Sequence, residues 1–131
     1  MEFGGKKTDM KGFLGSDSAP HPIQSKKGSG ATAAGCFTQP YVTSIVISAL
    51  EEAIERGWIT EAETTMEALE GFLSGFGRKF YKLDPSVKST RKIRLEKKGE
   101  KIPDLVRSAD GSVEVVPWGR GREIRSLSWV Q

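Results

Sequence analysis

The longest stretch of sequence with a helical spacing of apolar residues runs from residue 40 to residue 56, and it limits what this chain can fold into. Apolar side chains recur there at intervals of three and four positions, while glutamates occupy the other side. Pro40 suits the first turn of a helix, where its missing N–H group is not needed, and Gly57 suits the left-handed position after the last turn. The sequence therefore predicts an amphipathic helix from Pro40 to Arg56 that buries one face.

A second helix is predicted from Glu61 to Ser74. Thr60 and Glu63 have the spacing of a capping box, in which each side chain bonds a backbone N–H group of the other residue. The apolar stripe of this helix consists of Met66, Leu69, Phe72 and Leu73. The sequence Gly75-Phe76-Gly77 is expected to end it, because glycine is a poor helix former.

Several short segments have the features of β-strands. A brief strand is predicted over residues 11–15, and the alternation of basic and apolar residues from 91 to 96 is typical of an edge strand. Residues 113–116 and 124–130 flank the sequence Gly119-Arg120-Gly121, which indicates a strand, a turn and a second strand. The last third of the chain is therefore expected to be rich in short strands.

The chain has one cysteine, Cys36, and one histidine, His21. An internal disulfide and a metal site built from cysteine and histidine alone are therefore excluded. Cys36 precedes Phe37, and we expect it to be a small buried side chain. No apolar run reaches the roughly 18 residues that cross a bilayer, and the amino end lacks the apolar stretch of a secretory signal. These features favour a soluble protein of the cytoplasm.

The formal net charge of +3 is unevenly distributed along the chain. Residues 86–107 contain eight basic and three acidic side chains, a balance of +5, so the remainder carries about −2. A cationic segment of this kind attracts anionic partners, although many such segments are only solvated surface. Binding of a polyanion through residues 88–107 is therefore kept as an alternative function, while nucleic acid is not the favoured partner.

Asp17 and His21 are the side chains most suited to chemistry near the amino end. Asp17 follows the predicted strand, where a carboxylate could bind a metal or move a proton, or could cap a turn. His21 could bind an anionic group through a ring N–H, or lie unused on a surface loop. A Ser/His/Asp triad is excluded, because residues this close in sequence do not form the required chain of hydrogen bonds.

The segment from Gly28 to Gly35 consists mostly of small residues. It lacks the Gly-Lys-Ser/Thr ending of a phosphate-binding loop, so that function is not supported. A loop with few side chains can still bring its backbone N–H and C=O groups close to a ligand.

Four blocks of sequence together resemble dihydroorotases of the compact bacterial and fungal type, within the amidohydrolase superfamily. The most specific blocks are Phe13-Leu14-Gly15-Ser16-Asp17-Ser18-Ala19-Pro20-His21 and Ala33-Ala34-Gly35-Cys36-Phe37. Residues 72–83, with Phe80-Tyr81, extend the similarity, and Val115-Val116-Pro117-Trp118 with Trp129 resembles the family's carboxyl-terminal tail.

The resemblance implies a zinc-dependent cyclic amide hydrolase that interconverts (S)-dihydroorotate and N-carbamoyl-L-aspartate in pyrimidine biosynthesis. Asp17 matches the aspartate that contacts a metal in the two-zinc centre, takes a proton from the bridging hydroxide and delivers it to the leaving nitrogen. His21 matches the residue that binds the substrate carboxylate, and Ala34 the position whose backbone meets the substrate ring. A metal that acidifies bound water and a carboxylate that shuttles its proton form a coherent mechanism.

The family fold is a closed (β/α)₈ barrel of about 250 residues, whereas this chain has 131. The resemblance therefore predicts an α/β carboxyl-terminal fragment of the barrel: its last strand and helices over residues 1–83, and a β-hairpin extension over 84–131. The family's other metal ligands precede the matching region, so we expect this chain to be inactive alone. The parent enzyme is expected to act on small molecules away from membranes, and a homodimer is one assembly open to it. A structural partner of an intact dihydroorotase remains an alternative.

Overall fold

A computed structural model describes residues 12–27, 30–84, 86 and 91–130. The chain divides into two compact units, one of Met1–Gly15 with Ala53–Thr90 and one of Ser16–Glu52 with Arg91–Gln131. Both helices and strands occur, so the fold belongs to the mixed class that the sequence predicts. The boundary at residue 83 that the resemblance implies stays a prediction. None of the described helices has the length and apolar character needed to span a bilayer.

The helical region of the first unit begins with the predicted capping box, but its course differs from the prediction. The backbone N–H of Thr60 donates to Glu63 Oε2 at 2.8 Å, above a 3₁₀ turn at Glu61–Glu63. A second cap follows at Thr65, whose hydroxyl oxygen accepts from Ala68 N at 3.2 Å and starts α3, Met66–Glu70. Two caps in series interrupt the backbone at Thr64, so the continuous helix predicted from Glu61 is wrong at its start.

The predicted helix end at Gly75-Phe76-Gly77 is also wrong. The backbone continues from α3 through a π-helical turn, Gly71–Gly75, into α4, Phe76–Phe80. A Cβ added to Gly71 would lie 2.2 Å from Cζ of Phe76, so the ring occupies the space that a side chain would need. The absent side chain at Gly71 therefore makes room for the wide turn, and the glycines in this region do not end the helix.

Residues 12–15 do not form the strand predicted there. Leu14 N instead donates to the carbonyl of Phe72 at 2.9 Å. The ring of Phe13 lies 5.2 Å from that of Phe80 and 5.7 Å from that of Tyr81, between ring centroids. The segment is thus held by aromatic contacts with α4 and by one backbone bond. Lys11, the first residue of the predicted strand, lies outside the described residues.

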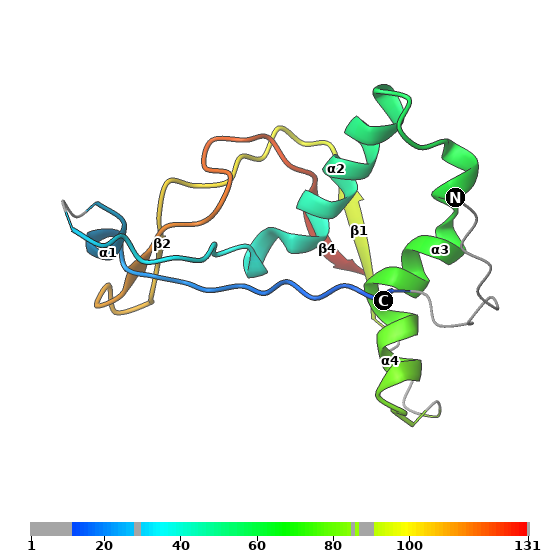
Figure 1. The fold of residues 1–131 in the computed structure, drawn as a ribbon, viewed down its shortest axis with the longest axis horizontal. Helices are drawn as coiled ribbons and strands as arrows, with labels where there is room; N and C mark the ends of the chain where they lie inside the picture. Colours follow the sequence, from blue (N-terminus) through cyan, green and yellow to red (C-terminus); the bar gives the residue numbers. More distant parts are fainter. Residues whose placement is uncertain (1–11, 28–29, 85, 87–90, 131) are drawn as a thin grey trace. The chain divides into compact units, whose positions relative to one another are not determined.

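The main helix of the second unit confirms the strongest sequence prediction. A 3₁₀ turn at Gln39–Tyr41 leads into α2, Val42–Glu55 (Figure 1). The last three residues of α2, from Ala53, are assigned to the first unit. Gly57 has φ of +70°, as predicted for the residue after the helix. A single turn of helix, α1, Ile23–Lys27, precedes it in the chain.

The strands predicted in the last third of the chain are present, but they pair differently. β1, Lys92–Glu96, is antiparallel to β4, Ser126–Val130. β2, Val106–Arg107, is antiparallel to β3, Glu114–Val115. The expected pairing of residues 113–116 with 124–130 is therefore wrong. Pro117, which cannot donate a ladder hydrogen bond, separates the two strands, and each pairs with an earlier strand (Figure 1).

The hydrophobic core in the described part of the chain is small. Ile102 and Ile124 are its buried hydrophobic side chains, at 2% and 7% exposure. The paired residues Ile93 and Trp129 lie on one face of the β1–β4 ribbon, and Trp129 is 66% exposed. Polar contacts therefore contribute a larger share of the stability of the second unit than they do in a domain with a full core.

Arg125 makes the principal contacts between α2 and the residues before β4. The buried hydroxyl of Ser44 donates to the Arg125 carbonyl at 2.7 Å. The Arg125 guanidinium donates through two nitrogens to the carboxylate of Glu51. This hydrogen bonding, aided by the positive charges of Arg125 and Lys97, holds the pKa of Glu51 below its ordinary value.

Replacement of Ser44 tests the first of these contacts. Ser44→Ala leaves the Arg125 carbonyl without its donor, and we expect the free energy of unfolding to fall by about 1–2 kcal/mol in urea denaturation. Ser48→Ala, four positions further along the same helix, removes a side chain for which the described residues give no hydrogen bond; it is the control and should change the free energy of unfolding by less than about 0.5 kcal/mol. Equal effects of the two substitutions would contradict the assignment.

Replacement of Glu51 tests the second contact through its pH dependence. Because the folded state lowers the pKa of Glu51, its contribution is present above the unfolded pKa, near 4.5, and is lost as the pH falls through the lower folded value. Glu51→Gln should lower stability at pH 7 by about 0.5–1 kcal/mol, since the carboxylate is partly exposed. The difference from the unsubstituted chain should shrink below pH 4. Glu55→Gln, at the end of the same helix, is the control and should change the stability at pH 7 by less than about 0.5 kcal/mol.

Candidate functional site

Asp17 lies on an exposed turn outside any helix or strand. Its φ of +42° places the backbone in the left-handed region, which aspartate adopts at lower cost than most residues. The flanking serines fix this turn. Ser18 Oγ accepts from the backbone N–H groups of Thr38 and Gln39, each at 3.1 Å, and Ser16 Oγ donates to Gln39 Oε1 at 2.7 Å.

By accepting these two bonds, Ser18 also satisfies backbone N–H groups at the start of the 3₁₀ turn that precedes α2. Thr38, the residue in the N-cap position of the 3₁₀ turn, makes no capping bond with its own side chain. The hydroxyl of Ser18 supplies that bond from a distant part of the sequence. The turn that carries Asp17 is therefore attached to the beginning of the longest helix.

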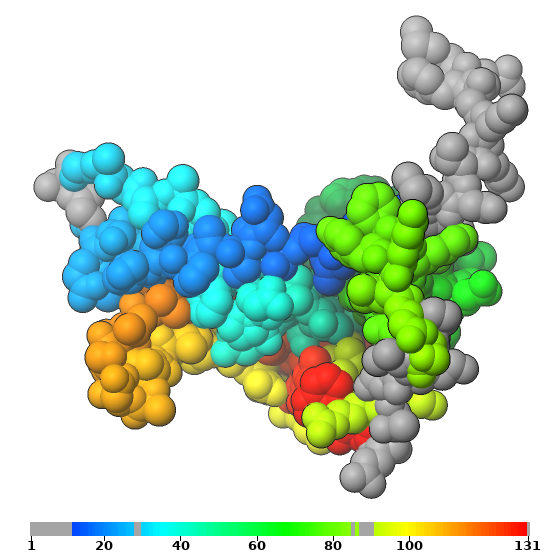
Figure 2. Space-filling model, turned by 90° about the horizontal axis from the view of Figure 1, so that it is seen from below, coloured from blue at the N-terminus to red at the C-terminus, as the bar shows by residue number. Residues whose placement is uncertain are grey.

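Residues 16–22 and 33–39 run side by side within the second unit. Ala19 N donates to the Cys36 carbonyl at 2.9 Å. In sequence, this bond lies between the Ser18 contacts and the loop around Ala34. The two segments are the adjacent blue and cyan traces in Figure 1, and both reach the surface shown in Figure 2. The Cys36 side chain is exposed, so the prediction that it would be buried is wrong. Its carbonyl, rather than its thiol, makes the contact between the segments.

His21 and the small-residue loop meet at Gly35. A Cβ added to Gly35 would lie 2.6 Å from Cβ of Ala19 and 3.6 Å from Nε2 of His21, and the φ of Gly35 is +98°. Glycine is required here both by the close approach and by the backbone angle. The structure thus brings His21 beside the loop that contains Ala34, and Asp17 lies on the same segment as His21.

Sequence reasoning missed three residues that shape this region: Ser16, Ser18 and Lys26. Lys26 Nζ donates to the carbonyls of Ala33 and Gly35, at 2.6 and 2.8 Å. Ala33 N in turn donates to the Ser25 carbonyl at 3.0 Å. A lysine and two serines in polar loops carry no periodicity, so only the resemblance to a known site could have drawn attention to them.

The described residues do not form a complete metal site. Among them, no group of three or more histidine, cysteine, aspartate or glutamate side chains is close enough to hold a metal ion. A zinc site in a protein takes three or four such ligands. Asp17 can therefore be at most one ligand of a centre whose other ligands come from elsewhere.

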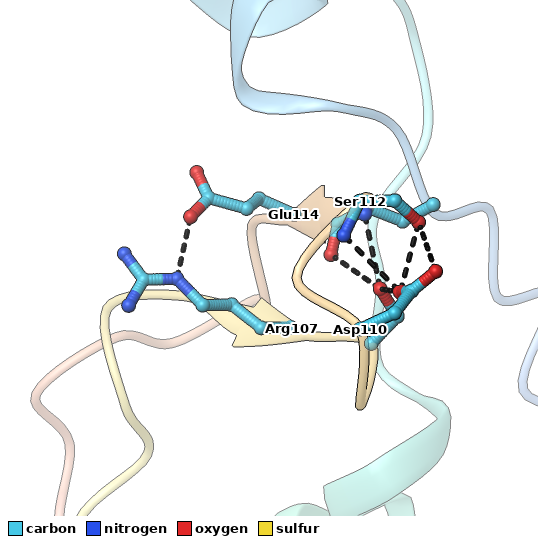
Figure 3. Close-up of polar contacts among 6 residues, drawn as sticks. Arg107, Asp110, Ser112 and Glu114 are labelled. Carbon is cyan, nitrogen blue, oxygen red and sulfur yellow. Dashed lines mark hydrogen bonds and ion pairs between the residues drawn. The ribbon is translucent and has the colours of Figure 1, made fainter.

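The basic segment 88–107 is partly neutralised by carboxylates in the part that the structure describes; residues 88–90 lie outside it. Lys98 Nζ lies 2.9 Å from Glu96 Oε2, and Lys97 lies 3.9 Å from Glu51. Arg107 donates to Glu114 across the β2–β3 pair (Figure 3). These pairs lower the positive charge available to a polyanion, and the alternative function is not favoured.

The loop between β2 and β3 is closed by its own polar groups. The hydroxyl of Ser108 and both the backbone N–H and the hydroxyl of Ser112 donate to the carboxylate of Asp110 (Figure 3). These bonds lower the pKa of Asp110 to about 2. Each of them lies within a few residues of sequence, so the cluster is a turn-stabilising arrangement.

Comparison with known proteins relates the chain to dihydroorotases. It is 34% identical to the enzyme of Saccharomyces cerevisiae over 119 residues, which cover 89% of this chain and 29% of that protein. It is 37% identical to the dihydroorotase of Picosynechococcus over 119 residues, or 91% and 29%. For Hahella chejuensis the identity is 35% over 113 residues, or 86% and 28%. No family model matches the sequence.

A solved structure supports the same relationship. The crystal structure of S. cerevisiae dihydroorotase in complex with 5-fluoroorotic acid matches with a TM-score of 0.70 and 33% identity, over 89% of this chain and 30% of that one. These comparisons confirm the resemblance to dihydroorotases that the sequence indicated. The chain spans less than a third of the length of these relatives.

The close approach at Gly35 provides a test of the site geometry. Gly35→Ala should place a methyl group against Ala19 and His21 and strain the backbone, lowering the free energy of unfolding by about 1–3 kcal/mol. Gly30→Ala is the matched control, because a Cβ there would meet nothing within 4 Å. Thermal denaturation of the two variants measures the difference. If Gly35→Ala were as stable as Gly30→Ala, residues 16–22 and 33–39 would not be in contact as described.

Proposed function

We propose that this chain provides part of the active site of a dihydroorotase, which interconverts (S)-dihydroorotate and N-carbamoyl-L-aspartate in pyrimidine biosynthesis. The observation that carries the proposal is the meeting of His21 with the backbone around Ala34, on segments that also hold Asp17. Similarity over about nine-tenths of the chain to enzymes named dihydroorotase supports the same assignment. In this proposal the chain is the carboxyl-terminal part of a barrel enzyme that works in the cytoplasm, with a homodimer as one assembly open to it.

Asp17 is assigned the movement of a proton. Its carboxylate is exposed, and the bonds from Ser16 and Ser18 fix the backbone on both sides of it. A carboxylate held in this way can accept a proton from an attacking water molecule and donate it to the nitrogen that leaves the opening ring. Fixing the turn reduces the entropy lost when the carboxylate, the water and the ring are brought into line.

His21 and Ala34 are assigned to substrate binding. The His21 ring can donate an N–H to the substrate carboxylate, and the exposed backbone of Ala34 can bond a polar group on the ring. Their two segments are in contact through Gly35, so the spacing between the two binding groups is set by the fold of this chain. Substrate orientation relative to Asp17 follows from that spacing.

The zinc centre of the family requires residues beyond those described here. Asp17 is proposed as the one ligand that this chain contributes, and no step of the reaction is derived through the metal. The chain alone should therefore be inactive, because the described residues do not gather a full set of ligands.

A chimera provides the test. The 119 residues of the S. cerevisiae enzyme that match this chain are replaced by the corresponding residues of this chain, and conversion of dihydroorotate is measured with zinc present. We expect activity from the chimera and none from the chain alone. Asp17→Asn should lower kcat by about 10²–10⁴-fold. His21→Asn should raise KM by about 10–100-fold, as expected for a lost bond to a charged group.

Asp104→Asn is the control for charge, because Asp104 is exposed and lies apart from the site in sequence. It should leave kcat and KM unchanged. A folded, zinc-loaded chimera with no activity would contradict the proposed function, as would full activity of the Asp17→Asn chimera.

A further inference from the structure

Lys26 makes two contacts that the proposed reaction does not use. Its ammonium group donates to the carbonyls of Ala33 and Gly35, at 2.6 and 2.8 Å, and so lies on one side of the backbone around Ala34. Ala33 N donates to the carbonyl of Ser25, the residue before Lys26, at 3.0 Å. The loop is therefore attached to α1 by three hydrogen bonds within three consecutive residues.

These bonds determine where the N–H group of Ala34 points. The peptide bond between Ala33 and Ala34 is trans, so its C=O and N–H groups point in opposite directions. Its C=O is turned toward Lys26, and the Ala34 N–H is therefore turned away from it. In the described part of the chain, no group accepts a hydrogen bond from the Ala34 N–H. Ala34 is an exposed residue, and the direction of its N–H is fixed.

The same contacts set the position of the loop relative to His21. The Gly35 carbonyl is held by Lys26, and the Cα of Gly35 is the atom whose added Cβ would lie 3.6 Å from His21 Nε2. A cation bonded to a carbonyl also polarises the attached peptide group, which makes its N–H a stronger donor. The Ala33 carbonyl belongs to the peptide group that carries the Ala34 N–H, so Lys26 affects both the direction and the strength of that donor.

We propose that Lys26 is a positioning residue, which aims the Ala34 N–H at an acceptor oxygen on the substrate ring and keeps this donor in register with His21. The inference rests on the proposed function for the identity of the substrate. It adds a residue that acts through the backbone and touches neither the substrate nor the metal. The chemistry recognised is a carbonyl oxygen of a cyclic amide.

Kinetics of the chimera test the role of Lys26. Lys26→Met keeps the length of the side chain but removes its charge and donors, and should raise KM for dihydroorotate about tenfold, the equivalent of one hydrogen bond, while kcat changes less. Lys26→Arg retains a cation and N–H donors, and should restore part of the loss. Lys27→Met is the matched control, since Lys27 is the exposed neighbour on the same helix, and should leave KM unchanged.

Nuclear magnetic resonance of the 131-residue chain gives a second measurement that needs no activity. With ¹⁵N-labelled alanine and glycine, Lys26→Met should move the amide signals of Ala34 and Gly35 further than Lys27→Met does. Unchanged signals, or an active chimera whose KM is unaffected by Lys26→Met, would overturn the inference. Inactivity of the unsubstituted chimera would instead count against the proposed function, and the amide signals would still decide whether Lys26 orients the loop.

Discussion

The contact of Arg125 with α2 is the interaction on which the second unit depends. Ser44 and Glu51 are separated from Arg125 by 81 and 74 positions in the sequence, yet one residue bonds both, through its carbonyl and its guanidinium. Few apolar side chains are buried in the described part, among them Ile102, Pro117 and Ile124, so burial of apolar surface contributes less than in a domain with a large core. A buried hydroxyl and a paired arginine therefore fix α2 where apolar packing alone would not define a single position.

The candidate site depends on α2 in turn. Ser18 bonds the backbone N–H groups that open the helical region, so the turn carrying Asp17 takes its position from the start of this helix. Lys26 and Gly35 then fix the loop beside His21. The groups assigned to proton transfer and substrate binding are thus held by hydrogen bonds within residues 16–39. Because the contacts of this loop are made by its backbone, its residues can be small, and at Gly35 the close approach of Ala19 leaves no room for a side chain.

Local features of this fold could be predicted from sequence, while long-range ones could not. The helix over residues 40–56 and the capping box of Thr60 with Glu63 depend on spacings of three and four residues, and both are present. The pairing of β1 with β4 depends on closing a long loop, which leaves no mark in the sequence of either strand. The helix end at Gly75 was mispredicted from the low helix propensity of glycine, whereas the backbone continues through a π-helical turn whose first residue, Gly71, leaves room for the Phe76 ring. At the site, the resemblance indicated Asp17, His21 and Ala34, but the hydrogen bonds by which Ser16, Ser18 and Lys26 hold these segments are visible only in the structure.

In the proposed enzyme, the groups assigned to substrate binding and the metal ligands differ in how they are held in place. In the described part of the chain, the loop around Ala34 is held by hydrogen bonds from Lys26 and to Ser25, so under the proposed function the groups assigned to substrate binding are ordered by this chain's own residues. Metal ligands must instead converge on one point, and the described residues provide no such group of three. The turn that carries Asp17, at positive φ, is held by the hydrogen bonds of its neighbouring serines. In the proposed enzyme, a segment ordered in this way lowers the cost of completing the centre, because joining the remaining ligands then orders mainly their own side chains.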